Sequence, residues 1–195
     1  MKTIAIEINN VLRNINKQIL KYYQKDFNQE LDLDECDEDK PWDYAIFKSK
    51  KEKNNFIYTD YPYELFGCAK TTGQNTARDL NNWLIELDEV EDEDYKVVLY
   101  SMDEESLTIQ SSYFFLSKIG ARVREVRFPL NFKEIKDIAD ILITYDAEKI
   151  KECKDKTTVY IGKGKCEEAT YSYETFDEFL KNNFITKHKD DDGNE

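Results

Sequence analysis

Residues 3–13 read TIAIEINNVLR, and this stretch decides the class of fold. Its first six residues are apolar or β-branched except for Glu7, which is typical of a strand buried in a parallel sheet. A pair of asparagines ends this run. From Val11 to about Gln24 apolar residues then recur every three or four positions, as one face of a helix requires. The chain therefore opens with a predicted strand–helix unit.

The alternation of strand and helix continues along the chain. Four further strands are predicted at residues 96–101, 122–128, 139–144 and 157–162, and the second of these alternates as an edge strand does. Apolar residues at helical spacing also predict helices. One covers residues 75–87, one follows the strand at residues 96–101 and ends at Ile119 before Gly120, and one lies around residues 176–180. Strands that alternate with helices predict an α/β fold with a doubly wound parallel sheet.

The length and composition indicate one folded domain. A chain of 195 residues, 40% hydrophobic and 13% aromatic, can bury one sizeable core. We expect a single domain over residues 1–186, with a cap-like insertion at about residues 28–94 and a flexible acidic tail over residues 187–195. In the insertion, the aromatic residues from Tyr58 to Phe66 can form a small hydrophobic core or, where exposed, supply anchors for a partner.

The charge and the rare residue types exclude several functions. A formal net charge of −13 opposes the phosphate backbone of nucleic acids, so no direct nucleic-acid binding is expected. The only histidine, His188, lies in the polar C-terminal segment, and the four cysteines form no C-x-x-C pair, which argues against zinc sites and histidine dyads. No apolar run approaches the ~20 residues of a membrane span, so no membrane partner and a location in the cytoplasm of a cell or host are expected.

Polar residues follow three of the predicted strands. In an open parallel sheet, ligands bind beyond the carboxyl ends of the strands. Glu7 and Asn9 stand at the end of the first strand, Ser101 at the end of the second, and Thr144-Tyr145-Asp146 at the end of the fourth. These residues form the candidate site.

Three of these segments resemble motifs of the haloacid dehalogenase (HAD) superfamily. IAIEINNVLR at residues 4–13 looks like the opening motif, in which apolar residues precede Asp-x-Asp-x-Val-Leu-Arg. VVLYS at residues 97–101 is similar to motif II, and DILITYD at residues 140–146 resembles motif IV. The resemblance covers about residues 1–26 and 95–165. It implies a HAD-like Rossmannoid fold with a small cap after the first helix, as in the deoxyribonucleotidase-like branch.

The resemblance also implies that the catalytic positions are degenerate. The family's hydrolysis uses an aspartate that attacks phosphorus and a second aspartate, two residues later, that protonates the leaving group. Glu7 and Asn9 stand at those positions, and Ser101 alone keeps the residue type of its motif. The longer glutamate displaces the attacking oxygen, and a misplacement of about 1 Å can cost about a hundredfold in rate. An amide transfers no proton near neutral pH, which removes a further factor of about 10² to 10⁴.

The same resemblance implies a weakened metal site. Thr144 stands where an acidic residue of the family helps to hold Mg²⁺, which leaves Glu7 and Asp146 as a thin set of ligands. No cofactor is therefore expected. If some activity remains, Mg²⁺ is the expected cofactor. The candidates for binding a phosphorylated ligand are Asn10, Ser101, Lys118 and Lys133, and the motif III lysine could be Lys118, Lys133 or Lys136.

Two classes of function fit these residues. The first is a catalytically inactive HAD-like domain that acts in protein–protein interaction, with other protein subunits as partners in an oligomeric assembly; the acidic surface and the degenerate site motivate it. The residue usage resembles that of AT-rich genomes, including many phages, which suggests a structural component of a phage particle, the virion. The alternative is a Mg²⁺-dependent phosphohydrolase of nucleotidase type, or a sensor that binds a phosphorylated ligand without hydrolysing it.

Overall fold

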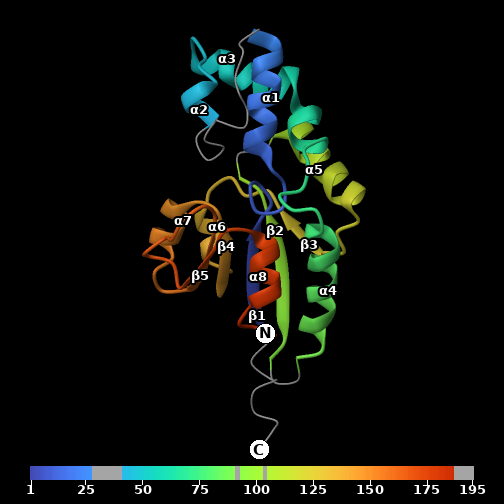
Figure 1. Ribbon diagram of the computed structural model, residues 1–195, viewed down its shortest axis with the longest axis vertical. Coiled ribbons are helices and arrows are strands. Elements are labelled where there is room, and N and C mark those ends of the chain that lie inside the picture. Colours follow the sequence, from blue (N-terminus) through green and yellow to red (C-terminus); the bar gives the residue numbers. More distant parts are fainter. Residues whose placement is uncertain (28–40, 91–92, 103–104, 187–195) are drawn as a thin grey trace, which may run out of the picture. The chain divides into compact units, whose positions relative to one another are not determined.

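The computed structural model of the protein describes residues 1–27, 41–90, 93–102 and 105–186 (Figure 1). The chain forms two compact units. Of the described residues, the sheet unit contains 1–12, 72–90, 93–102 and 121–186, and the helical unit contains 13–27, 41–71 and 105–120. In sequence, the helical unit therefore interrupts the sheet unit twice.

The sheet unit is built on six parallel strands in the order β3-β2-β1-β4-β5-β6. The strands are β1 (Lys2–Glu7), β2 (Tyr95–Tyr100), β3 (Glu125–Arg127), β4 (Ile141–Thr144), β5 (Thr157–Ile161) and β6 (Tyr171–Tyr173). The chain builds outward from β1 through β2 and β3, and then crosses to the other side of β1 to continue with β4. The predicted α/β class and doubly wound parallel sheet are confirmed, and strand order reverses at β1.

Four described helices accompany these strands. They are α4 (Thr76–Asp88), α6 (Lys133–Lys136), α7 (Ala147–Glu152) and α8 (Phe176–Asn182). α4 and α8 pack against each other, with the ring centroids of Trp83 and Phe179 5.5 Å apart. α6 inserts Ile135 into a core that includes Tyr100 of β2 and Leu142 of β4. This packing anchors two of the strands that end at the candidate site.

The helical unit has a core of its own. Its described elements are α1 (Ile15–Phe27), α2 (Pro41–Tyr44), α3 (Lys50–Asn55), the π-helical turns η1 (Phe56–Asp60) and η2 (Tyr63–Gly67), and α5 (Ser106–Ile119). The buried core residues are Ile15, Ile19, Tyr23, Ala45, Phe56, Ile57, Leu65 and Phe66. No described helix in either unit is long and apolar enough to cross a membrane.

The predicted insertion has different bounds in the structure. α1 belongs to the helical unit, α4 belongs to the sheet unit, and α5 joins the helical unit although it follows β2 in sequence. The aromatic stretch mainly builds the core of the helical unit. Phe66 is buried and so fits the alternative of a small hydrophobic core, while Tyr63 is exposed. Residues 28–40 of the predicted insertion and the predicted tail, residues 187–195, lie outside the described residues.

Gly120 ends α5 in the left-handed conformation, with φ of 71°. A side chain at this position is strained, so Gly120→Ala is expected to lower the free energy of unfolding by about 1 kcal/mol. Urea unfolding followed by circular dichroism measures this loss. Ser117→Ala, at an exposed position of the same helix, is the control and should change stability by less than about 0.5 kcal/mol. Equal stability of the two variants would contradict the prediction.

Candidate functional site

The register of three neighbouring strands places Glu7 between two hydroxyl-bearing side chains. Glu7 ends β1 and is paired with Tyr100, the last residue of β2. On the other side of β1, Ile6 is paired with Ile143, so that Thr144 follows beside Glu7. Side chains in register on parallel strands point to the same face. The candidate site therefore begins as a row of three polar groups at the carboxyl ends of β2, β1 and β4.

The Glu7 carboxylate is almost fully buried, with 2% of the residue exposed. Its Oε1 accepts a hydrogen bond from the Lys149 ammonium, with Nζ at 2.6 Å. Its Oε2 accepts a hydrogen bond from the Thr144 hydroxyl and a longer one, at 3.4 Å, from the Tyr100 hydroxyl. Both carboxylate oxygens are therefore engaged by donors of the protein itself.

Burial controls the protonation of this row. It raises the pKa of the Glu7 carboxyl above its ordinary value, and the charge of Lys149 opposes the shift. Burial also raises the pKa of the Tyr100 phenol well above its ordinary value, and the charge of Glu7 adds to that effect. Tyr100 consequently stays a neutral hydrogen-bond donor near neutral pH.

The structure brings Asn9 and Ser101 together. The Asn9 side-chain amide donates a hydrogen bond to the Ser101 hydroxyl, with Nδ2 and Oγ 3.1 Å apart. Ser101 is buried directly after β2. Asn10 has φ of 56°, a left-handed conformation that asparagine tolerates better than most residues. The turn at Asn10 thus carries the chain away from β1 while Asn9 stays at the site.

Asp146 and Lys149 stand at the start of α7. Asp146 is the N-cap of this helix, and its Oδ1 accepts a hydrogen bond from the backbone N–H of Glu148 at 2.9 Å. Lys149 follows in the first turn, and its Nζ lies 2.6 Å from Glu7 Oε1 and 3.8 Å from Asp146 Oδ2. The ammonium therefore lies close to both carboxylates that the sequence suggests as metal ligands.

Sequence reasoning missed Lys149. Lys118 is an exposed residue of α5 in the helical unit, and Lys133 is exposed at the start of α6. Lys136 donates a hydrogen bond to the Glu152 carbonyl. Among the described contacts, Lys149 is the lysine that meets Glu7. The signal that could have identified it is its position three residues after Asp146, because a helix capped by Asp146 brings such a residue back over the strand ends.

The residues present do not fit a Mg²⁺ ion. Magnesium usually keeps several waters and binds one or two carboxylates, whose oxygen atoms must be open to complete its near-octahedral shell. Within the described residues, no group of three or more His, Cys, Asp or Glu side chains could hold a metal ion. Thr144 Oγ1 donates to Glu7 and accepts the backbone N–H of Asp146 at 3.1 Å, so it is already used in both directions. The position expected for a metal ion is thus held by protein donors.

The fold and the site define an α/β chain with the HAD-like fold and an acid–lysine pair at its strand ends. Two solved structures resemble it over nearly their whole length. YfnB from Bacillus subtilis, described as a HAD-hydrolase bound to magnesium, aligns with a TM-score of 0.54 and 8% identity over 92% of this chain and 97% of that chain. A protein from Burkholderia xenovorans, described as a haloacid dehalogenase-like hydrolase, aligns with a TM-score of 0.55 and 10% identity over 93% of this chain and 95% of that chain.

These similarities confirm the predicted HAD-like fold. At such low identities they show the fold alone. No family model and no curated protein matches the chain. These similarities therefore do not establish the activity of this chain.

A groove of about 600 Å³ lies elsewhere in the sheet unit. It is lined by residues of α4, including Leu84 and Ile85, by the first residues of β2, and by residues 122–125 at the start of β3. The groove is therefore at the amino ends of the strands, away from Glu7.

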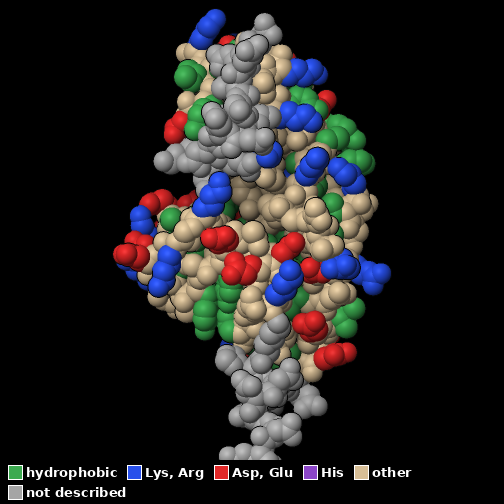
Figure 2. All heavy atoms as spheres, viewed as in Figure 1, with side chains coloured by type: hydrophobic (Ala, Val, Ile, Leu, Met, Phe, Trp, Pro, Cys, Tyr) green, Lys and Arg blue, Asp and Glu red, His purple; other side chains and the backbone are tan. Residues whose placement is uncertain are grey.

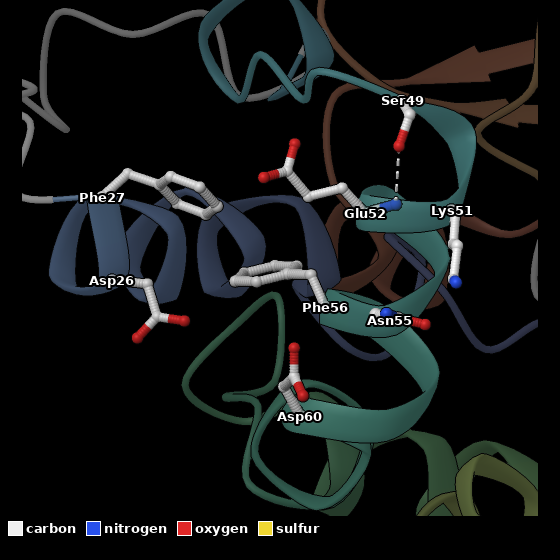
Figure 3. A pocket seen from close by; sticks show the side chains of 8 residues that line it. All are labelled: Asp26, Phe27, Ser49, Lys51, Glu52, Asn55, Phe56 and Asp60. Carbon is white, nitrogen blue, oxygen red and sulfur yellow. Dashed lines mark hydrogen bonds between the residues drawn. The ribbon is translucent and has the colours of Figure 1, made fainter.

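A hollow of about 330 Å³ in the helical unit combines aromatic rings with carboxylates (Figure 3). The rings of Phe27 and Phe56 lie in it, with centroids 6.4 Å apart. Figure 3 shows the carboxylates of Asp26, Glu52 and Asp60 around these rings. Aromatic faces and negative charges together attract cations. Lys51 also lines the hollow, but the three carboxylates outnumber its ammonium group, so the hollow favours a basic side chain.

Proposed function

We propose that this chain is a HAD-like domain that does not hydrolyse phosphate esters and acts through protein–protein interaction. The first half of this proposal, the absence of hydrolysis, rests on the hydrogen bonds that the Glu7 carboxylate accepts. A nucleophilic carboxylate must present an oxygen to phosphorus. Here Lys149 holds one oxygen, Thr144 and Tyr100 hold the other, and the residue is buried. Attack on a substrate would require these contacts to break first.

Asn9 supports the same half of the proposal. Its amide is a poor acid and a poor base near neutral pH, so it cannot protonate a leaving group or activate water. Its Nδ2 donates one hydrogen bond to the Ser101 hydroxyl, so Asn9 acts as a hydrogen-bond donor in the folded protein. By their resemblance to the HAD motif, Glu7 and Asn9 stand at the two catalytic positions. Neither residue supports catalysis there.

The surface chemistry supports the second half of the proposal. The formal net charge of −13 favours partners with a basic surface. On the face shown in Figure 2, acidic and basic side chains are interspersed, and the basic ones form no single large patch. The hollow bounded by Phe27, Phe56 and Asp60 has the chemistry to accept an arginine or lysine of such a partner. A role as a subunit of a phage particle is the narrower form of this proposal and rests on residue usage alone.

Hydrolysis assays test the first half. The expected result is that hydrolysis of p-nitrophenyl phosphate and of nucleoside monophosphates by the purified chain does not exceed that of Glu7→Ala, with or without Mg²⁺. Lys181→Ala is a matched control at an exposed lysine outside the candidate site. Mg²⁺-dependent hydrolysis that disappears in Glu7→Ala but persists in Lys181→Ala would overturn the proposal in favour of a phosphohydrolase.

Light scattering and particle analysis test the second half. We expect the purified chain to form a defined oligomer or to co-purify with a basic partner, and the interaction to weaken in a Glu52→Gln/Asp60→Asn variant. Mass spectrometry of purified particles tests the phage form of the proposal. A chain that stays monomeric, binds no partner and is absent from particles would contradict the interaction role.

A further inference from the structure

The Lys149 ammonium occupies a position built to hold a positive charge. Its Nζ lies 2.6 Å from Glu7 Oε1 and 3.8 Å from Asp146 Oδ2, and 13% of its side chain is exposed. The ring centroids of Tyr100 and Phe132 lie 5.5 Å and 5.8 Å from Nζ, so aromatic faces add to the attraction. Two negative groups and two rings therefore surround one lysine.

We propose that Lys149 is the resident cation of this site and takes the place of a divalent metal ion. The ammonium is bonded to one of the two carboxylates that a metal would need and is near the other. A divalent ion bound to the same pair would meet a like charge within a few ångströms, which is unfavourable in a poorly solvated site. The site therefore binds no Mg²⁺ while Lys149 is present.

The remaining oxygen atoms of the site reinforce this exclusion. Asp146 Oδ1 accepts the backbone N–H of Glu148, and Thr144 Oγ1 accepts the backbone N–H of Asp146. Glu7 Oε2 is held by the Thr144 and Tyr100 hydroxyls. A metal ion would have to displace several of these donors at once, and each displaced donor would need a new acceptor. The protein's own hydrogen bonds thus add to the exclusion of a metal ion by Lys149.

This inference deepens the first half of the proposed function, the absence of metal-dependent hydrolysis, and it is independent of whether the domain binds a partner. The two can fail separately. Hydrolysis without Mg²⁺ would contradict the proposed function and leave the inference intact. Binding of Mg²⁺ at this site without hydrolysis would contradict the inference and leave the proposed function intact.

Isothermal titration calorimetry with MgCl₂ tests the inference directly. The unmodified chain should give no site-specific heat up to about 10 mM Mg²⁺, and its Tm should not change. Thr144→Asp/Lys149→Ala adds a carboxylate and removes the resident cation, so this variant should bind Mg²⁺ with a stoichiometry of about one and gain several degrees in Tm. Lys149→Arg keeps the positive charge and should behave as the unmodified chain does.

The inference is overturned if the unmodified chain binds one Mg²⁺ and Glu7→Gln abolishes that binding, or if a folded Thr144→Asp/Lys149→Ala variant binds none. A measurement on the unmodified chain guards against misfolding of the double variant. Nitrogen-15 NMR of the lysine ammonium groups should show a Lys149 signal that is absent in Lys149→Arg and does not shift when Mg²⁺ is added. A shift or loss of this signal with Mg²⁺ would contradict the inference.

Discussion

Replacing Lys149 by methionine is expected to lower the free energy of unfolding by about 3–5 kcal/mol near neutral pH, because it leaves the Glu7 carboxylate buried without a cation. The Glu7 and Lys149 side chains are 3% and 13% exposed, so water screens their attraction little. Methionine fills a similar volume, which limits the contribution of a cavity. Urea unfolding followed by circular dichroism measures the loss.

The pH dependence of this loss identifies its electrostatic origin. Without Lys149, the pKa of Glu7 should rise further, because the charge that opposes the effect of burial is gone. A carboxyl whose folded-state pKa lies above its unfolded value contributes stability at low pH and loses it as pH rises through the folded-state pKa. The deficit of Lys149→Met should therefore be small near pH 5 and should grow toward about pH 8.

The matched control is Lys133→Met. Lys133 is exposed, and its replacement should change stability by less than about 0.5 kcal/mol at any pH in this range. The prediction fails if Lys149→Met loses no more stability than Lys133→Met, or if its deficit is the same at both ends of the range.

Arg13→Met is expected to lower the free energy of unfolding by about 2–4 kcal/mol, because it removes buried contacts within the helical unit. Arg13 is fully buried, and its Nη1 donates to the Phe66 carbonyl at 2.8 Å and to the Ser112 hydroxyl at 2.6 Å. Its guanidinium carbon also lies 5.0 Å from the Phe66 ring centroid and 5.5 Å from that of Phe115. Methionine keeps the apolar stem but leaves buried acceptors without their donor.

Amide hydrogen exchange locates this effect. Protection should fall in α1, η2 and α5, the elements that contain or contact Arg13 and its partners, before it falls in β1 and β4. Arg78→Met is the control, because Arg78 is largely exposed and pairs with its neighbour Asp79 at the surface. Similar exchange in the two variants would show that the buried contacts of Arg13 contribute little.

The sheet and the acidic residues of the site, Glu7 and Asp146, could be predicted from the sequence, and the role of Lys149 could not. Apolar runs such as residues 3–8 and 139–144 indicate strands because burial on both faces leaves few polar positions. Once the strands are known, parallel order places Glu7, Ser101 and Asp146 at one edge of the sheet. The resemblance to HAD motifs adds which of these positions would carry catalysis.

The unpredicted parts are short or depend on tertiary packing. α7 has six residues and β6 has three, so neither shows a period that could be distinguished from chance. The side chain of Lys149 reaches Glu7 only because α7 packs beside β4 and β5. Its position three residues after Asp146 is the local signal for Lys149, whereas the neighbouring Lys151 forms a surface pair with Glu148. The division into two units likewise depends on α5 packing against η2 across a long interval of sequence.

A double-mutant cycle between Glu7 and Lys149 tests the central claim most directly, namely that these side chains form the ion pair that occupies the site. The free energy of unfolding is measured near neutral pH for the unmodified chain, Glu7→Gln, Lys149→Met and the double variant. We predict a coupling energy of about 2–3 kcal/mol, with the double variant more stable than Lys149→Met alone. A coupling energy below about 0.5 kcal/mol, with the two single losses simply adding, would contradict the account.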